Sequence, residues 1–139
     1  MIKLSKKTDY ALVALSHLQV QRRPISAKEI ADTYNLSLSM LANVLKSLSS
    51  AGLVASTRGS SGGYQLGRAP KLITLGEVVD LFDGQKSLSD CTSNETHCAA
   101  EGHCPAHSPM VMIHQRIKDF MHSISLADLA HPTLQGFYL

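Results

Sequence analysis

Hydrophobic residues recur at helical spacing in the first part of the chain. Four of them are spaced i, i+3, i+4 and i+7 and predict a helix over residues 5–20: Ala11, Ala14, Leu15 and Leu18. A shorter helix is expected over residues 27–34, because Ser26 and Glu29 form a Ser-x-x-Glu capping box. In such a box the hydroxyl and the carboxylate each satisfy a free backbone N–H group at the helix N-terminus. Three residues of this helix are expected to face inward: Ile30, Ala31 and Tyr34.

A tight turn at residues 35–37 leads into a third helix, expected over residues 39–51. Its apolar face is continuous, and Gly52 is placed to end it: Leu41, Val44, Leu45 and Leu48. The opposite face is expected to be exposed and carries small, polar or basic residues: Ser39, Met40, Asn43, Lys46 and Ser47. Two helices joined by a tight turn, the second with an exposed polar face, follow the helix–turn–helix plan.

Two short extended runs follow, at residues 53–58 and 64–66, on either side of a glycine-rich turn. They predict a β-hairpin, and a hairpin directly after a recognition-type helix is a wing. Arg58 lies at its tip, where we expect it to enter a narrow minor groove or to pair with a phosphate. Residues 1–70 are therefore expected to form a winged helix–turn–helix DNA-binding domain. The alternative is a small helical core that carries a hairpin without a role.

Pro70 marks a boundary, after which a connecting helix is expected within residues 71–89. It begins at a second capping box, formed by Thr74 and Glu77, and ends at Gly84. One side of this helix is apolar: Leu75, Val78, Val79 and Phe82.

A long helix is expected over residues 110–126, with Ser108 and Pro109 as its N-cap and first helical residue. Its apolar residues alternate at spacings of three and four: Met110, Ile113, Ile117, Phe120 and Ile124. Such a seam predicts dimerisation with a second copy of the chain, the alternative being packing on the chain's own wing domain. Residues 127–139 form a tail without a clear pattern. The fold class is thus mainly α, a winged helix–turn–helix domain plus a long C-terminal dimerisation helix.

All three cysteines lie in the loop of residues 90–109, as Cys91, Cys98 and Cys104 in a C-x6-C-x5-C pattern. Three thiols this close together can bind one metal centre, with a nearby histidine or carboxylate as the fourth ligand. An iron–sulfur cluster, a structural zinc ion and a thiol switch through disulfide formation all fit the spacing. Zinc is disfavoured because the usual C-x2–4-C pairs are missing.

Charge and composition narrow the class of protein. The chain has 139 residues, 44% of them hydrophobic, and a formal net charge of +2. Residues 1–70 hold nine basic and three acidic residues, whereas residues 71–139 hold four basic and eight acidic ones, so the first half is expected to face a polyanion. The odd number of cysteines argues against a disulfide framework, and no signal peptide or membrane span is expected, which favours the cytoplasm. Neither a catalytic constellation nor a phosphate-binding loop is present, so we do not expect an enzyme.

Several segments together resemble the Rrf2 family of bacterial winged-helix regulators. They are TDYAL near the N-terminus, LSLSMLANVLKSLSSAGLV, RGSSGGYQLGR and the three-cysteine loop, and the resemblance spans residues 1–128. It implies a homodimeric transcription factor whose protomers cross over through the C-terminal helix. It also implies a repressor of iron–sulfur assembly or iron-homeostasis genes; a repressor that senses nitric oxide or redox state is the near alternative.

The same resemblance implies particular ligands and DNA contacts. Cys91, Cys98 and Cys104 would hold a 2Fe–2S or 4Fe–4S cluster. The fourth ligand would be His107, as in the regulators of iron–sulfur assembly, or Asp9 of the partner protomer, as in the nitric-oxide sensors. Ten residues would contact the double-stranded DNA of a pseudo-palindromic operator: Lys28, Ser37, Ser39, Met40, Asn43, Lys46, Arg58, Gly59, Ser60 and Tyr64.

Overall fold

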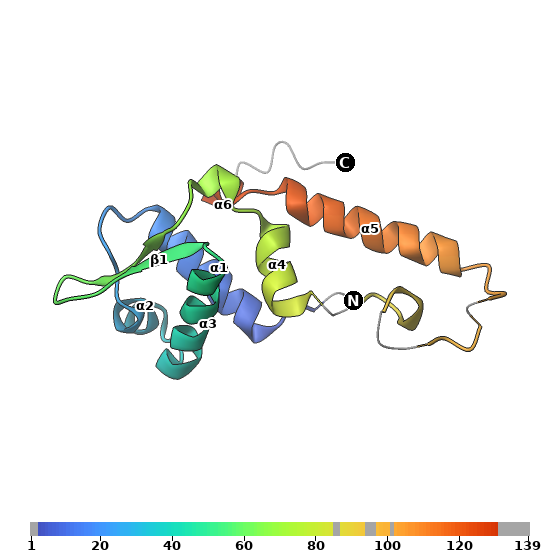
Figure 1. Ribbon diagram of the computed structural model, residues 1–139, viewed down its shortest axis with the longest axis horizontal. Helices are drawn as coiled ribbons and strands as arrows, with labels where there is room; N and C mark the ends of the chain where they lie inside the picture. The colour runs from blue at the N-terminus through green and yellow to red at the C-terminus, as the bar shows by residue number, and fades with distance from the viewer. Residues whose placement is uncertain (1–2, 85–86, 94–96, 101, 131–139) are drawn as a thin grey trace.

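The protein has a helical body from which one long helix projects (Figure 1). The structure is a computed structural model that describes residues 3–84, 87–93, 97–100 and 102–130. In chain order its elements are α1 (Lys6–Gln19), α2 (Ala27–Tyr34), α3 (Leu38–Ser50), β1 (Val54–Thr57), β2 (Gly63–Leu66), the 3-10 turn η1 (Pro70–Leu72), α4 (Leu75–Asp83), the 3-10 turn η2 (Asp90–Thr92), α5 (His107–Ser123) and α6 (Leu126–Ala130). This mainly helical fold with a single two-stranded hairpin confirms the expected fold class.

The hydrophobic core lies where α1, α3 and β1 meet. The apolar faces predicted for the first and third helices are confirmed, since all eight residues are buried: Ala11, Ala14, Leu15, Leu18, Leu41, Val44, Leu45 and Leu48. Ile73, Val78 and Leu126 belong to the same buried cluster, so the core continues beyond Pro70 into the second half of the chain. The prediction for Tyr34 is wrong, because its ring is 45% exposed and its hydroxyl lies 2.9 Å from Nδ1 of His17 on α1.

Both predicted capping boxes form only in part. The hydroxyls of Ser26 and Thr74 accept hydrogen bonds from the backbone N–H groups of Glu29 and Glu77, at 3.1 and 3.2 Å. The two carboxylates, expected to return to the N-cap backbone, pair instead with arginines that precede each helix. Glu77 binds Arg68 at 2.6 Å and thereby ties the end of the wing to α4. Each acid therefore fixes how the preceding segment enters its helix.

The wing hairpin is held against the body by a third extended segment. β1 and β2 are antiparallel, with Val54 opposite Leu66. Ile25, in the segment before α2, bonds to the outer edge of β2: its N–H donates to the Tyr64 carbonyl at 3.0 Å, and the Tyr64 N–H donates to the Ile25 carbonyl at 2.7 Å. Gly63 permits this approach, since a Cβ there would lie 2.6 Å from the Ile25 carbonyl, and its φ of +151° disfavours other residues.

The long helix α5 is shifted by three residues at each end from the predicted bounds. It begins at His107, three residues before the expected 110, and Pro109 is its third residue, where a backbone N–H still has no helical partner. It ends at Ser123, because Ile124 has extended dihedral angles and is buried. Ile124 is therefore a core residue, and its predicted place in the exposed seam is wrong.

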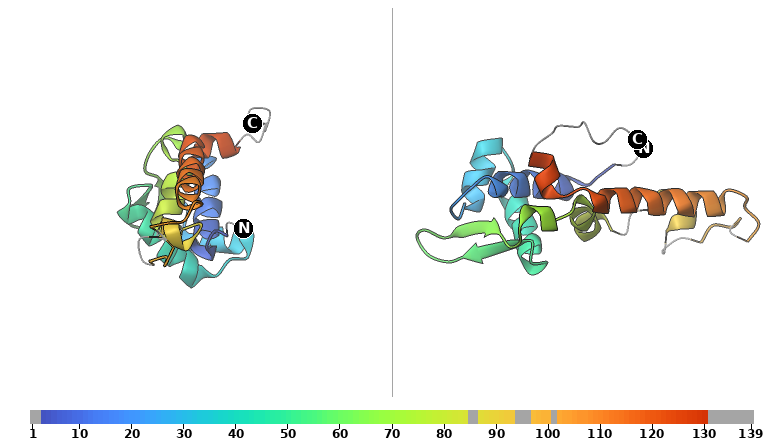
Figure 2. Two further views of the ribbon diagram at one scale, coloured as in Figure 1. Left: turned by 90° about the vertical axis from the view of Figure 1, so that its right-hand side faces the viewer. Right: turned by 90° about the horizontal axis from the view of Figure 1, so that it is seen from above.

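After α5 the chain returns to the body and is bonded to it. The N–H of Leu75 donates to the Ile124 carbonyl at 2.8 Å, and the N–H of Leu126 donates to the Ile73 carbonyl at 2.8 Å. Leu126 is only 2% exposed and starts α6, where the expected tail begins; residues 131–139 lie outside the described residues. The α5 helix is thus anchored at its C-terminal end and extends away from the body, as the right-hand view of Figure 2 shows.

We expect Gly63→Ala to destabilise the protein more than Gly59→Ala. Both glycines have a positive φ, so either alanine incurs backbone strain of about 1–3 kcal/mol. At Gly59 the space for a Cβ is open, whereas at Gly63 it collides with the backbone of Ile25. Chemical denaturation of the two variants measures the difference, and equal losses in the free energy of unfolding would contradict the close contact.

Candidate nucleic-acid interface and cysteine loop

The turn between α2 and α3 is fixed by local caps and by one tyrosine from α1. Asn35 ends α2 in the left-handed conformation, with φ of 52°. Ser37 is the N-cap of α3, its hydroxyl accepting from the Met40 N–H at 3.5 Å. The backbone N–H of Ser37 donates to the hydroxyl of Tyr10 at 3.1 Å. Tyr10 therefore locks the turn onto α1, a role that the sequence pattern did not indicate because Tyr10 lies far from the turn in the chain.

The outer face of α3 carries most of the residues expected there. Ser39, Asn43 and Lys46 are exposed. Met40 is half-exposed, and part of its side chain packs against the buried core. Ser47 is half-exposed as well, and its hydroxyl donates to the Asn43 carbonyl at 3.2 Å.

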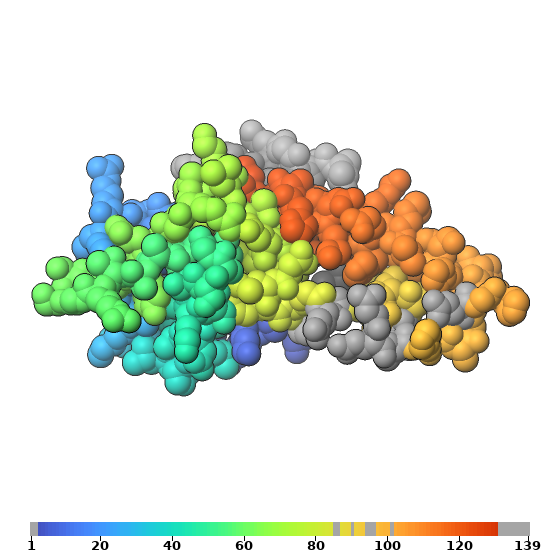
Figure 3. All heavy atoms as spheres, viewed as in Figure 1, coloured from blue at the N-terminus to red at the C-terminus, as the bar shows by residue number. Residues whose placement is uncertain are grey.

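The wing presents a small exposed tip. Arg58, Gly59 and Ser60 lie between the two strands and are exposed, whereas Tyr64 is half-buried in β2 and packs against the core. The tip forms one end of the elongated molecule in Figure 3, and the start of α5 lies near the other end.

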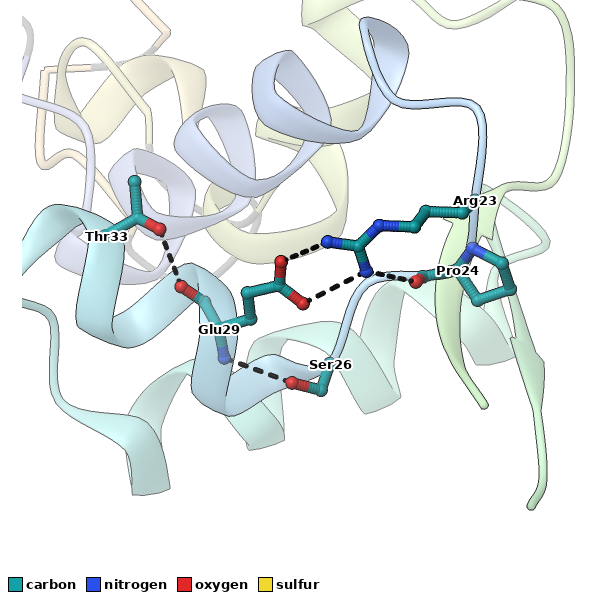
Figure 4. A network of polar contacts seen from close by, with 5 residues as sticks. All are labelled: Arg23, Pro24, Ser26, Glu29 and Thr33. Carbon is teal, nitrogen blue, oxygen red and sulfur yellow. Dashed lines mark hydrogen bonds and ion pairs between the residues drawn. The ribbon is translucent and has the colours of Figure 1, made fainter. Parts of the chain in front are cut away.

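Two ion pairs hold α2. Lys28 and Asp32 are one helical turn apart and bond at 2.6 Å, and this bond to Asp32 raises the pKa of Lys28. At the start of the helix, the guanidinium of Arg23 bonds both carboxylate oxygens of Glu29, at 2.5 and 3.3 Å (Figure 4). The bond to Arg23 lowers the pKa of Glu29, and the pKa of Arg23 is raised in turn. Arg23 also donates to the Pro24 carbonyl, so one side chain joins the approach segment to α2.

The cysteine loop lies beside the N-terminal half of α5. Cys91 is in η2, which packs against α5, and its sulfur lies 3.1 Å from the Ser89 hydroxyl. Cys91, Cys98 and Cys104 are free thiols and each is half-exposed. His107 is the first residue of α5, and its N–H donates to the Cys104 carbonyl at 3.3 Å.

The structure does not gather the predicted ligands around one point. Among the residues it describes, no three His, Cys, Asp or Glu side chains converge as a metal site. Asp9 is exposed in the first turn of α1, on a different element from the loop. Ligation of a cluster by these residues stays a prediction.

A buried polar cluster joins the start of α1 to the end of α4, directly before the cysteine loop. Asp83 is 6% exposed and Thr8 is fully buried. One Asp83 oxygen accepts the Thr8 hydroxyl at 2.6 Å and the Ser5 N–H at 2.9 Å. The carboxylate thus sits at the N-terminus of α1, where the helix dipole favours negative charge. Sequence analysis missed Asp83, because only the fold brings it to residues more than seventy positions away.

A helix–turn–helix followed directly by a hairpin wing defines the winged helix–turn–helix class of DNA-binding domains. The sequence profile of the Rrf2 family, described as "Iron-dependent Transcriptional regulator", matches residues 4–132. The chain therefore belongs to the Rrf2 family of transcriptional regulators, proteins that bind DNA and are not enzymes.

Individual relatives agree with this assignment. The HTH-type transcriptional regulator IscR of Aliivibrio salmonicida (strain LFI1238) is 35% identical over 130 residues, covering 92% of this chain and 77% of the relative. Among solved structures, CymR, the global cysteine regulator of B. subtilis, is 34% identical with a TM-score of 0.74, covering 94% of this chain and 97% of that one. T. potens IscR is 28% identical with a TM-score of 0.72, covering 99% and 89%.

In the described part of the chain, no helix is both long and apolar enough to cross a membrane.

Replacing Glu29 by Gln is expected to destabilise the protein slightly at neutral pH, because the pair with Arg23 is exposed, and to have no electrostatic effect in acid. The folded protein holds the pKa of Glu29 below its ordinary value of 4.5, so the ion pair with Arg23 stabilises the fold above that pH. The contribution disappears as pH falls through the lowered pKa. Melting temperatures of both proteins at several pH values measure it, and a difference that persists unchanged in acid would contradict the ion pair.

Proposed function

We propose that this protein is an iron–sulfur-cluster-dependent repressor of genes for iron–sulfur assembly or iron homeostasis. It acts as a homodimer on a pseudo-palindromic operator. The observation that carries the proposal is a set of three unbridged, half-exposed thiols in the loop that leads into α5. The relative from Aliivibrio salmonicida, whose name is IscR, supports the assignment by its identity over nearly the whole of this chain.

The donor set fits a cluster chemically. Thiolates are the standard protein ligands of iron–sulfur clusters, and an imidazole can replace a thiolate at one position. His107 follows Cys104 closely and begins α5, so we assign it as the fourth ligand, with Asp9 of the partner protomer as the alternative. When bound, the cluster would supply a link between loop residues that is lost on oxidation or iron shortage. Cys91, Cys98, Cys104 and His107, as ligands of the cluster, would then hold the loop in order against α5.

DNA recognition is assigned to α3 and the wing. Ser39 and Asn43 present hydroxyl and amide groups that can bond base edges in a major groove, and Met40 offers an apolar contact. Lys46 would bind phosphate; Lys28 would do so after exchanging its Asp32 partner for a phosphate. The wing and turn complete the proposed contacts: Ser37, Arg58, Gly59, Ser60 and Tyr64.

Dimerisation is assigned to the outer face of α5. Four large apolar side chains on this helix are exposed by about two-fifths or more: Val111, Met112, Ile113 and Phe120. The other two predicted seam residues on the helix, Met110 and Ile117, are half-buried. Apolar area of this kind on a projecting helix is typical of a protein–protein interface, and the mate that fits a self-complementary face is a second copy.

A second candidate is a cluster-free regulator whose thiols act as a switch or bind zinc. Two observations favour it: the described cysteines do not converge on one point, and one relative is named a global cysteine regulator. Protein purified without oxygen distinguishes the candidates, because iron and sulfide in equal amounts support a cluster, whereas zinc or the lack of any metal supports the switch.

Replacing Lys46 by Ala is expected to weaken DNA binding and to flatten its dependence on salt. A lysine that neutralises one phosphate contributes about 0.9 to the slope of log affinity against log salt concentration. Lys71 serves as the control, because it is exposed on η1, which packs against α6. Fluorescence anisotropy with a duplex selected by the protein from a random pool gives both slopes. A slope that Lys46→Ala leaves unchanged, or that Lys71→Ala lowers equally, would remove Lys46 from the interface.

Replacing Cys98 by Ala is expected to abolish the visible absorption of the cluster and to leave a folded protein. Ala99→Ser changes the adjacent loop residue and serves as the control. Iron and sulfide counts on protein purified without oxygen, together with circular dichroism, make the comparison. A cluster retained by Cys98→Ala would overturn the ligand assignment. If His107→Ala loses two irons per protomer, the result would support a 2Fe–2S centre. If Asp9→Ala loses four irons per protomer, the result would support a 4Fe–4S centre.

A further inference from the structure

Helices α4 and α5 come into close contact at a glycine of α4. Gly76 in the first turn of α4 is buried against His122 in the last turn of α5. A Cβ on Gly76 would lie 2.5 Å from the ring atoms Cγ and Cδ2 of His122 and 2.8 Å from its backbone nitrogen. Real Cβ atoms do not approach other atoms so closely, so a side chain here would push the two helices apart.

Polar contacts surround this point and join the same two helices. Nε2 of His122 lies 2.9 Å from Oδ2 of Asp80, whose other oxygen lies 3.6 Å from Nζ of Lys118. Nδ1 of His122 lies 3.5 Å from the Thr74 hydroxyl. That hydroxyl accepts the Glu77 N–H as the cap of α4, so its own proton is free to point at Nδ1. Both ring nitrogens thus lie near polar groups of α4 and its cap, so one imidazole joins the cap of α4 to the end of α5.

The two helices separate toward their other ends. A cavity of about 840 Å³ lies beside them, bordered by α4 at Val79 and Asp83, by α5 at His114 and Met121, and by the N-terminal segment at Lys3 and Lys6. Leu88, two residues before the cysteine loop, lines it as well. Figure 1 shows α4 and α5 meeting near α6 and diverging toward the loop. The pair is therefore in contact at Gly76 and His122, and the cavity borders it from beside this contact toward the loop.

We propose that the contact between Gly76 and His122 is a pivot for α5, and that the cysteine loop controls DNA affinity by setting the angle of α5 at this pivot. The inference rests on the proposed function and adds the positioning residues through which it operates. The absence of a side chain at Gly76 lets the two helices come into contact. His122, held by Asp80 and Thr74, marks the point about which α5 turns.

Three features of the structure support a pivot at this place. Two backbone hydrogen bonds fix the C-terminal end of α5 directly beside the contact. The Leu75 N–H donates to the Ile124 carbonyl, and the Leu126 N–H donates to the Ile73 carbonyl. The open cavity lets the opposite end move without breaking a packed core. The 17 residues of α5 span roughly 25 Å, so a small rotation at the pivot becomes a large displacement at the far end of the helix. In the proposed dimer the same rotation displaces the partner's α3.

The test compares Gly76→Ala with the double variant Gly76→Ala/His122→Ala in the full chain. Leu81→Ala, an exposed position on the same helix, is the matched control. A spin label on p-acetylphenylalanine at Ser50, the exposed end of α3, reports the distance between the two protomers by pulsed electron paramagnetic resonance. We expect Gly76→Ala to shift this distance by more than the roughly 1–2 Å of a minor helix adjustment. The double variant should return part of the way, toward the distance of His122→Ala alone, because the clash with the ring is gone while the His122 backbone nitrogen remains.

DNA binding gives a second measurement on the same proteins. With a duplex selected by the wild-type chain from a random pool, Gly76→Ala should lose about tenfold in affinity for the full operator, within the range of allosteric couplings. Affinity for a half-site should change less than about twofold, since one winged domain suffices for it. Equal loss on both duplexes, or no recovery in the double variant, would overturn the pivot.

Two further results keep the inference testable. If Gly76→Ala does not fold, His122→Ala takes its place: loss of the ring must broaden the distance distribution and lower full-operator affinity relative to Leu81→Ala, and unchanged values overturn the pivot. A wild-type chain that gives no distance between protomers overturns the proposed dimer itself. A normal wild-type distance that Gly76→Ala leaves unchanged overturns the pivot alone.

Discussion

Two backbone hydrogen bonds between residues 73–75 and 124–126 hold the parts of this molecule together. They return the chain to the core after α5, so that Ile124 is buried and Leu126 joins the buried cluster that includes residues of α1 and α3. Without this return α5 would be joined to the body only through the cysteine loop. With it, the helix is fixed to the body at its C-terminal end and projects from the body with η2 packed against it, which is the geometry of a lever.

The lever connects the two chemically distinct ends of the protein. At its fixed end lies a compact winged domain, in which Tyr10, Asn35 and Ser37 orient α3 through caps and a single buried hydroxyl contact. At its free end lies the loop with Cys91, Cys98 and Cys104. In the proposed dimer, a change of loop chemistry would alter DNA affinity without reaching the recognition helix directly, because the position of the partner's domain would depend on the direction of α5.

Charged groups serve mainly to join segments across the fold. Glu29 pairs with Arg23 and Glu77 with Arg68, so both acids that local pattern places at helix N-termini are bonded to the segments preceding those helices. Asp83 does the same with deeper burial, closing the end of α4 onto the start of α1. These contacts fix where each connecting segment enters its helix, and exposed pairs such as that of Arg23 add little stability by themselves.

The sequence alone determined the elements whose signals are local. Apolar periodicity predicted the buried faces of α1 and α3, Ser26 and Thr74 predicted where two helices begin, and the glycine-rich turn predicted the wing. Each of these patterns reflects neighbours within a few residues. Motif resemblance led correctly to the Rrf2 family.

Only the tertiary structure decided which side chains meet across the fold. Ile25 pairs with β2, Gly76 lies against His122, and Ile124 leaves the seam for the core. Such contacts join residues tens of positions apart. At Ile124 the apolar period of the helix continues in the sequence, but the chain leaves the helix there because backbone pairing with residues 73–75 is more favourable. Periodicity indicates which face of an element is apolar. Packing of the whole chain decides which partner covers that face and where backbone pairing ends a helix.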